Sequence, residues 1–385
     1  MNKCIIIISC IVQLAVVVVV ADDPPGHMQP IGSHMPPMPI EERDDLPNPT
    51  EFYDNYVTPG KPVVFKGVVK KFPNFNNLRN DSYLRDLYGD TTFNTDKLKE
   101  EVIDKPFPMK MYEFLSVYEK EDVYLIDPLS DGPFANTEVF VPKPLLCEKV
   151  LNMIVIWFSS GNSKSLLHND AYDNLNCLYD GSKDLLLIDQ KYEDSLPLDV
   201  LPDQVSNMSS LDVEKVDMYK YGKLSNIPWY GTTIEAGDCF YIPIKWFHQL
   251  KGPKGRNLAI NYWLNMKNDP IHREDCVGIF FPEYKTYSQY RTDPVASLEN
   301  KILFNAFNGS SNTTKRNLIS AVIALFPDNL EQYDKIDHLK QAQRYFHLLD
   351  TNGDDVLTIQ EVKSFKESGA GSENFFPSLS IKDEL

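Results

Sequence analysis

The chain has 385 residues, of which 55 are acidic and 38 are lysine or arginine, so its formal net charge at pH 7 is −17. Such an acidic surface repels the phosphates of nucleic acids, and we therefore expect no DNA or RNA partner. Acidity of this degree suits a soluble protein in a calcium-rich lumen.

The N-terminus has the pattern of a secretory signal peptide. One basic residue, Lys3, precedes an apolar run over residues 5–20, and small residues then lead to Ala21. We expect cleavage after Ala21, which removes residues 1–21 and leaves no membrane span. The alternative is an uncleaved signal anchor, because the apolar run approaches a short transmembrane length. Residues 22–45, rich in proline and methionine, predict a flexible, extended arm.

Residues 46–267 combine a few short helices with many short strands. Strands punctuated by Gly and Pro predict a mainly β domain, an antiparallel double-sheet jelly roll with flanking helices. The expected elements are helices at 51–56, 83–87 and 111–118, strands at 62–65 and 153–158, and hairpins joining 176–179 to 183–188 and 247–250 to 258–261. The polar segment 192–230 is longer than a usual connection and predicts a loop over the mouth of a site.

Three side chains within this region predict a metal site. His168 and Asp170 are two positions apart, so on a β-strand both point to the same face. His248 follows in a later strand and supplies a second imidazole. Two imidazoles and one carboxylate form the facial triad of non-haem Fe(II) oxygenases, which leaves coordination positions open for cosubstrate and oxygen. Structural Zn(II) is the alternative for the same three residues.

Lys183 lies fifteen residues beyond His168 and begins the apolar run 183–188. A lysine in a buried strand needs an anionic partner, because an unpaired charge there is unfavourable. The distal carboxylate of 2-oxoglutarate is one such partner. A salt bridge to a neighbouring carboxylate of the protein is the other.

These motifs resemble the JmjC-domain, cupin-like oxygenases of the small protein-hydroxylase type. The resemblance covers about residues 46–264 and extends to the approach Gly237-Asp238-Cys239-Phe240-Tyr241-Ile242-Pro243 before His248. It implies a double-stranded β-helix fold, with Fe(II) held by the triad and the 2-oxoglutarate C5 carboxylate held by Lys183. It also assigns the cosubstrate pocket to Ser165, in place of the commoner Thr, and to Asn174 and Asn261. Either asparagine could instead be a satisfied core amide.

Beyond the jelly roll, residues 268–330 predict a helical extension, through which related hydroxylases often dimerise. Residues 331–368 predict an EF-hand, a helix followed by a twelve-residue calcium loop. Its expected calcium ligands are Asp350, Asn352, Asp354, the Val356 carbonyl, Thr358 and Glu361. Position 6, normally Gly, is Asp355, which must adopt a left-handed conformation with some strain. The stretch 304–326 is a possible degenerate partner, and an acidic turn between two helices is the alternative for the loop.

The tail 369–385 ends in Lys382-Asp383-Glu384-Leu385, a retrieval signal read by the KDEL receptor. With the leader peptide it predicts the endoplasmic reticulum lumen. Four glycosylation sequons agree with this compartment, at Asn80, Asn207, Asn308 and Asn312. The mature chain keeps Cys147, Cys177, Cys239 and Cys276, whose pairing the sequence leaves open; for Cys177 and Cys239 free thiols are at least as expected as a bridge.

The leading hypothesis is an Fe(II)- and 2-oxoglutarate-dependent dioxygenase that hydroxylates a side chain of a secretory-pathway protein. Lysine demethylation uses the same metal site, although a histone substrate does not fit the lumen. The rival is a non-catalytic, calcium-responsive binding or folding factor on a cupin scaffold. The retained triad and Lys183 favour the enzyme, because a module without catalysis has no need of them.

Overall fold

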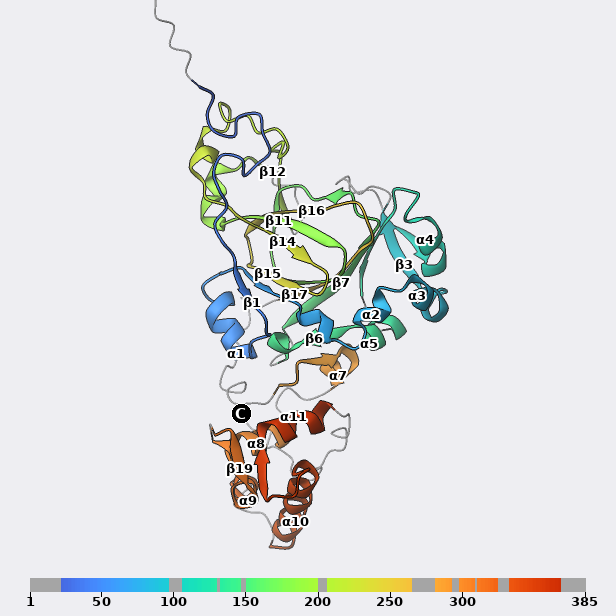
Figure 1. Cartoon of the computed structure of the whole chain (residues 1–385), viewed down its shortest axis with the longest axis vertical. Helices are drawn as coiled ribbons and strands as arrows, with labels where there is room; N and C mark the ends of the chain where they lie inside the picture. Colours follow the sequence, from blue (N-terminus) through green and yellow to red (C-terminus); the bar gives the residue numbers. More distant parts are fainter. Residues whose placement is uncertain are drawn as a thin grey trace, which may run out of the picture.

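Two antiparallel-dominated sheets face each other and form the body of the molecule in this computed structural model (Figure 1). The structure describes residues 22–96, 106–129, 132–146, 150–199, 206–264, 281–292, 298–308, 310–324 and 332–367. The signal peptide, the KDEL tail, Cys147 and Cys276 lie outside these ranges. No helix within them combines the length and the apolar character that a membrane crossing needs.

The larger sheet has nine strands among the described residues. In spatial order they are β1 (Glu41–Arg43), β2 (Val63–Phe65), β15 (Cys239–Ile242), β10 (Asp173–Asp180), β17 (Asn257–Leu264), β7 (Leu151–Ser159), β5 (Tyr124–Pro128), β3 (Thr92–Asp96) and β4 (Phe107–Lys110). All neighbours are antiparallel except β1 and β2. The expected strands at 62–65 and 153–158 are confirmed.

The second sheet has seven strands, with β8 (Ser163–Lys164) beside β16. The others, in spatial order, are β12 (Leu198–Asp199), β13 (Ser206–Ser209), β9 (His168–Asp170), β16 (Phe247–Gly252), β11 (Ser182–Ile188) and β14 (Tyr230–Glu235). Two facing sheets of this kind agree with the predicted mainly β jelly roll.

Short helices cover the outer face of the nine-stranded sheet. They are α1 (Pro49–Phe52), continued by a π-turn at Tyr53–Val57, α2 (Phe75–Leu78), α3 (Asp81–Tyr88), α4 (Met111–Val117) and α5 (Pro133–Glu138). Local sequence starts them: Pro49 is the first residue of α1, and the Asn80 side chain accepts the backbone N–H of Ser82 at the start of α3. The three helices expected near 51–56, 83–87 and 111–118 are confirmed.

Alternation along the strands separates two cores. In β10, Leu175, Cys177 and Tyr179 pack with the covering helices, whereas Leu178 packs between the two sheets. In β11, Leu187 likewise belongs to the core between the sheets. Because successive side chains of a strand point to opposite faces, every second residue of β10 and β11 is directed into the space between the sheets.

The two predicted hairpins are wrong. Strand β10 pairs with β15 and β17, while β11 pairs with β14 and β16, so the turn between them joins the two sheets. The same holds for β16 and β17. Gly181 allows the tight crossing: its φ is +80°, and a Cβ there would lie 2.5 Å from the Arg256 carbonyl oxygen. Turn residues predict a chain reversal, but not which neighbour each strand then takes.

The described parts of the segment 192–230, residues 192–199 and 206–230, are packed on the sheet rather than forming only a loop over the site. Their apolar residues form a core with Leu186, Ile188 and Phe247, which lie on the outer face of the seven-stranded sheet. The segment contributes Leu196, Leu211, Val213, Val216, Met218, Leu224 and Ile227. It also supplies β12 and β13, which extend the sheet beyond β9. The polar residues dominated the sequence pattern, but the widely spaced apolar ones decide the packing.

The predicted free arm at residues 22–45 lies against that segment. Met28 N donates to Val216 O at 2.7 Å, and Ile31 N donates to Val213 O at 2.8 Å. Trp229 Nε1 donates to Met35 O at 2.7 Å. The arm was mispredicted because its partners lie about 190 residues away, where composition carries no signal.

Cys177 and Cys239 form a disulfide between paired positions of β10 and β15. Both cysteines are fully buried on the helix-covered face. The expectation that free thiols were at least as probable here is therefore wrong. Burial in core strands did not distinguish the two states, because only the strand register shows that the cysteines are opposite each other.

The C-terminal region forms a separate helical core. Strand β18 (Tyr284–Thr286) pairs with β6 (Phe140–Pro142), and α7 (Tyr287–Thr292) follows it. Helices α8 (Leu298–Phe307), α9 (Lys315–Ile323), α10 (Gln332–Leu349) and α11 (Ile359–Glu367) then share one core, with β19 (Asn312–Thr314) paired to β20 (Val356–Thr358). Thus α8 and α9 belong with the predicted EF-hand rather than to a separate extension 268–330.

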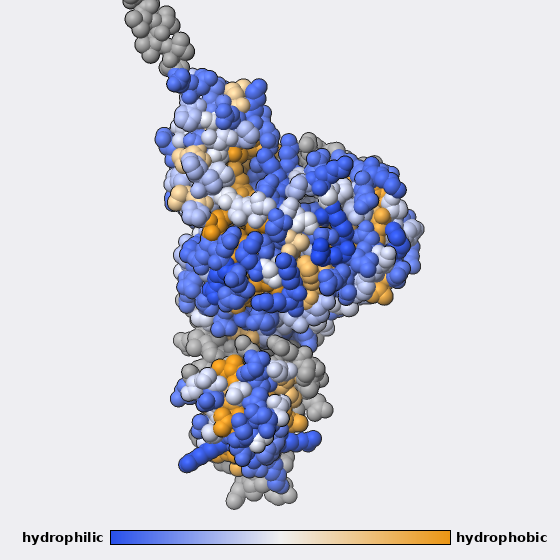
Figure 2. Space-filling view, in the orientation of Figure 1, coloured by the Kyte–Doolittle hydropathy of each residue, from blue (hydrophilic) through white to orange (hydrophobic). Residues whose placement is uncertain are grey.

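Hydrophilic residues dominate the visible surface, as the net charge implies (Figure 2).

Arg256 ties the sheet-crossing turns to the covering helices. Its guanidinium donates to Asp81 Oδ1 at 3.0 Å, to Asp180 Oδ2 at 2.8 Å and to Leu78 O at 2.7 Å. The guanidinium also lies over the Phe158 ring, 4.4 Å from its centroid. Its side chain is 15% exposed, so these contacts are only weakly screened by solvent.

We predict that Arg256→Ala lowers the free energy of unfolding by roughly 2–4 kcal/mol, because it leaves two carboxylates without their shared partner. Urea unfolding followed by tryptophan fluorescence measures this. Arg85→Ala, which removes an exposed arginine of α3, is the matched control and should change the value by less than about 0.5 kcal/mol. Equal effects of the two substitutions would contradict the assigned role of Arg256.

Candidate metal centre

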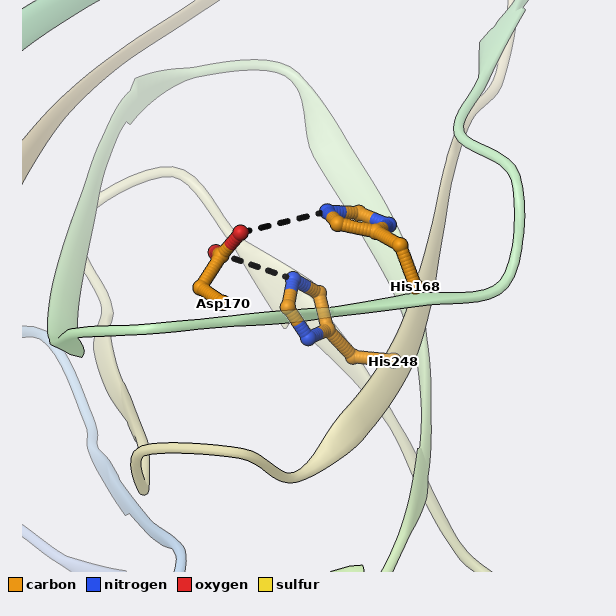
Figure 3. Close-up of side chains that lie close together, drawn as sticks. All are labelled: His168, Asp170 and His248. Carbon is orange, nitrogen blue, oxygen red and sulfur yellow. Dashed lines mark ion pairs between the residues drawn. The ribbon is translucent and has the colours of Figure 1, made fainter. Parts of the chain in front are cut away.

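The three predicted metal ligands come together on the inner face of the seven-stranded sheet. His168 in β9 is directly opposite His248 in β16, and Asp170 lies two residues further along β9. His168 Nε2 lies 3.9 Å from Asp170 Oδ1, and His248 Nε2 lies 3.6 Å from Asp170 Oδ2 (Figure 3). One ligand atom from each residue lies within 4.8 Å of the others. The predicted cluster is therefore assembled without rearrangement.

Backbone hydrogen bonds orient both imidazoles. His168 Nδ1 is 2.9 Å from Leu166 O, and His248 Nδ1 is 3.0 Å from Trp246 O. With the proton held on Nδ1, each Nε2 presents a lone pair toward Asp170. Burial, together with the neighbouring His168, lowers the pKa of His248 to about 4. His248 is therefore neutral at pH 7, which is the form that binds metal ions.

Lys183 points into the same space from β11. It alternates with Leu185 and Leu187, both in the core between the sheets, and only 6% of its surface is exposed. Burial lowers the pKa of Lys183 to about 8. Among the described residues, no carboxylate lies within 4.0 Å of its Nζ, so the alternative of a salt bridge within the protein finds no support there.

The predicted pocket asparagines also face inward, from the opposite sheet. Asn174 and Asn261 are 3% and 4% exposed and lie on β10 and β17. The Oδ1 atom of Asn174 has no hydrogen-bond partner, so this residue is not a satisfied core amide. Asn261 Oδ1 accepts from Asn176 Nδ2, its cross-strand neighbour. The amide nitrogen of Asn261 takes no part in that bond.

Ser165 is not brought to Lys183 by a hydrogen bond. Its hydroxyl oxygen accepts the backbone N–H of Leu250 at 3.0 Å, and its carbonyl accepts from Gln249 Nε2 at 3.2 Å. The hydroxyl proton is still available for a ligand. Ser165 is therefore joined to β16 at Leu250, which pairs with Leu185 of β11.

Several inward-facing residues were missed from the sequence. Asn176 is 1% exposed with an unpartnered Oδ1, and the indole N–H groups of Trp157 and Trp263 are buried without a partner. Met208 lies directly opposite His168, and Tyr230 lies opposite Leu187, the neighbour of His248. Strand alternation from Asn174 and Asn261 could have found Asn176 and Trp263, but Met208 depends on β13, which no local pattern predicted.

The predicted calcium loop, residues 350–361, follows α10 and contains β20 and the first residues of α11. Asp350 Oδ1 accepts the backbone N–H of Gly353 at 3.0 Å, and Asp350 Oδ2 accepts that of Asp355, also at 3.0 Å. Glu361 Oε1 accepts the N–H of Thr351 at 3.1 Å, from the other end of the loop. Asp355 has φ +62°, which confirms the left-handed conformation expected at position 6. The carboxylates at positions 1 and 12 thus both accept hydrogen bonds from backbone N–H groups of this loop.

The sequons occupy different settings. Asn80 is exposed at the start of α3, and Asn308 and Asn312 are exposed around β19. Asn207 lies in β13, paired with Asn169, and its side chain is outside the described part of the structure.

Comparison with known proteins gives one family match and several distant relatives. Residues 49–270 match the cupin-like domain. The chain is 30% identical over 131 residues to the lysine-specific demethylase JMJ31 of Arabidopsis thaliana, covering 33% of this chain and 24% of that protein. It is 23% identical over 248 residues to the Jumonji C domain-containing protein 5 of Drosophila melanogaster, covering 57% and 58%. The chain thus spans less than two thirds of either relative.

A third relative is matched over more of its length. The human bifunctional peptidase and (3S)-lysyl hydroxylase JMJD7 is 22% identical over 274 residues, covering 60% of this chain and 86% of that protein. Demethylation and hydroxylation of lysine both occur among the names of these relatives.

The burial of Lys183 leads to a prediction about stability. The unfolded chain keeps the lysine proton up to about pH 10, whereas the folded protein releases it near pH 8, so charged Lys183 destabilises the fold below pH 8. Lys183→Met should therefore raise the free energy of unfolding at pH 7 by about 2–3 kcal/mol. The gain should shrink as the pH rises from 8 to 10. Urea unfolding at pH 7 and pH 10 measures both values; a destabilised variant at pH 7 would contradict the unpaired charge.

Proposed function

Since this chain belongs to the family of proteins with a cupin-like domain, we propose that it is an Fe(II)- and 2-oxoglutarate-dependent dioxygenase that hydroxylates a protein side chain in the endoplasmic reticulum lumen. The observation that carries the proposal is the combination of the His168–Asp170–His248 cluster with a buried lysine that has no described anionic partner. Each part answers a different requirement of the reaction.

The three ligands fit a metal that must keep open positions. Two imidazoles and one carboxylate occupy one side of the site, and their Nε2 and carboxylate oxygen atoms face a common point. A structural Zn(II) site usually takes four protein ligands, so a closed site would need another donor. A cluster of three ligands with one free side instead suits the facial triad of Fe(II) oxygenases.

The inner face of the barrel fits a dicarboxylate. Lys183 supplies an ammonium for the distal carboxylate, and the Asn261 amide nitrogen and the Ser165 hydroxyl supply donors on either side. Asn174 adds a further buried amide that lacks a partner at Oδ1. When bound, iron and 2-oxoglutarate would supply the oxidising chemistry: 2-oxoglutarate and O₂ are converted to succinate and carbon dioxide, one oxygen atom of O₂ enters succinate, and the other enters the new hydroxyl group of the substrate side chain. The protein orients these groups and excludes bulk water.

Two side chains flank the ligands in the same row of the sheet. The row runs Met208, His168, His248, Leu187, Tyr230 across β13, β9, β16, β11 and β14. Residues opposite each other on neighbouring strands point to the same face, so Met208 and Tyr230 border the metal on its two sides. Tyr230 is backed by the Trp246 ring, with centroids 5.3 Å apart. A substrate side chain would pass between these walls, whether the outcome is hydroxylation or demethylation.

We predict that the purified protein converts 2-oxoglutarate to succinate only when Fe(II) is present, and that His168→Ala and Asp170→Ala each abolish the conversion. Lys183→Ala should raise the 2-oxoglutarate concentration needed for half-maximal rate at least tenfold, with little effect on the iron requirement, because it removes one charge-assisted contact. Succinate formation measured by mass spectrometry reports both. Turnover that survives in both ligand variants would leave the non-catalytic binding factor as the better account.

A second function, calcium binding, is favoured by the loop between α10 and α11. Asp355 already adopts the backbone conformation that position 6 requires, and Asp350 and Glu361 converge from the loop ends. Asn352, Asp354, the Val356 carbonyl and Thr358 would complete the oxygen ligands. An affinity of about 10⁻⁴ to 10⁻³ M, as in extracellular modules, fits a loop with this strain.

We predict that Glu361→Gln weakens calcium binding more than any other single substitution in the loop, because Glu361 supplies two oxygens. Asp355→Gly should tighten binding, since glycine adopts φ +62° at little cost. Calorimetry of the full-length luminal protein with each variant tests both. The absence of calcium-dependent heat at millimolar concentrations would reduce the loop to an acidic turn.

We propose the endoplasmic reticulum lumen from the leader peptide, the terminal Lys382-Asp383-Glu384-Leu385 and the sequons, with the KDEL receptor as a partner. Deleting residues 382–385 should send the protein into the medium, with glycans at one or more of Asn80, Asn207, Asn308 and Asn312. Immunoblotting of cells and medium, before and after deglycosylation, tests this. Retention in an integral-membrane fraction would instead identify residues 1–21 as an anchor.

Dimer formation through the helices after the jelly roll stays a prediction from the family resemblance.

A further inference from the structure

The pairing of β19 with β20 aligns two loops that are far apart in the sequence. The register places Thr313 opposite Leu357, with Asn312 opposite Thr358 and Thr314 opposite Val356. Leu357 is position 8 of the predicted calcium loop, which begins at Asp350. If Thr313 is given the same position, the corresponding loop begins at Ala306 and ends at Asn317 (313 − 7 = 306; 306 + 11 = 317).

The surrounding elements obey this alignment. Helix α9 begins at Lys315, position 10 of the first loop, and α11 begins at Ile359, position 10 of the second. At position 9, Thr314 Oγ1 accepts the N–H of Asn317 at 3.4 Å, and Thr358 Oγ1 accepts the N–H of Glu361 at 3.2 Å. Both loops therefore begin their second helix with the same cap, three residues before position 12.

The residue after each loop is also equivalent. Leu318 and Val362, each at position 13, are fully buried and belong to the same core. Gly309, at position 4, lies outside the described residues, but position 4 supplies no cation ligand. Strand register, helix starts, caps and core positions thus agree independently on one alignment.

The first loop has lost the residues that hold a cation. Positions 1, 3, 5 and 12 carry Asp350, Asn352, Asp354 and Glu361 in the second loop, but Ala306, Asn308, Ser310 and Asn317 in the first. No carboxylate remains at these positions, and Lys315 and Arg316 add positive charge at positions 10 and 11. A divalent cation has neither the acidic first ligand nor the bidentate last one there.

A side-chain hydrogen bond closes the first loop in place of a cation. Thr313 Oγ1 donates to Ala306 O at 2.5 Å, joining position 8 to position 1, and both residues are 2% exposed. The second loop has Leu357 at position 8, which cannot form this bond. Closure of the first loop therefore needs no ion, whereas the acidic groups of the second loop would be brought together by one.

We infer that residues 306–317 form a cation-free EF-hand loop, locked by Thr313, and that the C-terminal helices are a paired EF-hand unit with a single cation position. The unit keeps its fold without calcium because one half is closed permanently. Calcium then acts on the loop 350–361 and α11 alone. The statement that the wild type binds one cation rests on the proposed calcium function. The statement that residues 306–317 form a cation-free EF-hand loop does not depend on it.

A gain-of-function experiment tests this. Ala306→Asp, Ser310→Asp and Asn317→Glu together restore acidic ligands at positions 1, 5 and 12, and should add one calcium site to the full-length luminal protein. The matched control, Ser311→Asp with Arg316→Glu, makes the same change of −3 in charge at positions 6 and 11, and should add none. Calorimetric titration with Ca²⁺ alone counts the sites, and circular dichroism confirms that each variant is folded.

The outcomes separate the two proposals. Two calcium sites in the restored variant and one in the wild type support both this inference and the proposed calcium function. One site in the restored variant and none in the wild type support this inference and reject calcium binding at residues 350–361. An unchanged site number in a folded restored variant, or an equal gain in the control, overturns the inference.

Because Ala306 is buried and the restored variant could unfold, Thr313→Val and Thr313→Ser give a second test. In calcium-free buffer Thr313→Val should lower the midpoint of thermal unfolding, because it removes the hydrogen bond to Ala306 O, and Thr313→Ser should keep the wild-type midpoint. Equal midpoints for the two variants would contradict the role of Thr313 in closing the loop.

Discussion

The ammonium group of Lys183 lies inside the barrel with 6% of the residue exposed, and no described carboxylate is within ion-pair distance. Burying such a charge without a partner opposes folding, and here burial lowers its pKa to about 8. Groups with strongly perturbed pKa values are concentrated at functional sites. The position of Lys183 on the face that also carries His168 and His248 connects this electrostatic strain to the metal site.

The architecture supports this arrangement with two outer layers. Helices cover one side of the nine-stranded sheet, and the segment 192–230 with the N-terminal arm covers the outer side of the seven-stranded sheet. Both sheets therefore have one face available for the site while their other faces remain in apolar cores. Strands on both sides hold His168, Asp170 and His248 so that one ligand atom from each residue lies within 4.8 Å of the others.

Sequence reasoning succeeded where chemistry and local spacing coincide. The His168-x-Asp170 pair and the position of His248 were sufficient to predict which side chains the fold brings together, because alternation in a strand fixes which side chains share a face. The same rule, applied from Asn174 and Asn261, could have added Asn176 and Trp263. The left-handed Asp355 was likewise foreseen from loop position alone.

The failures concern long-range pairing. Residues around Gly181 predict a reversal but do not say that β10 and β11 enter different sheets. The partners of Met28 and Met208 lie about 190 and 40 residues away, and the disulfide partner of Cys177 lies 62 residues away. Such contacts depend on the summed burial of many apolar residues, to which no short motif corresponds.

The protonation of Lys183 is the most direct measure of the account. Nuclear magnetic resonance of the protein with ¹³C-labelled lysine side chains, with Zn(II) as a diamagnetic metal and Lys183→Met for assignment, gives its pKa. We predict a value near 8 in the ligand-free protein and a rise of at least one unit when 2-oxoglutarate binds, because the carboxylate stabilises the charged form. A ligand-free value near 10.5, or a value unchanged by saturating 2-oxoglutarate, would contradict the claim that this lysine is held unpaired for the cosubstrate.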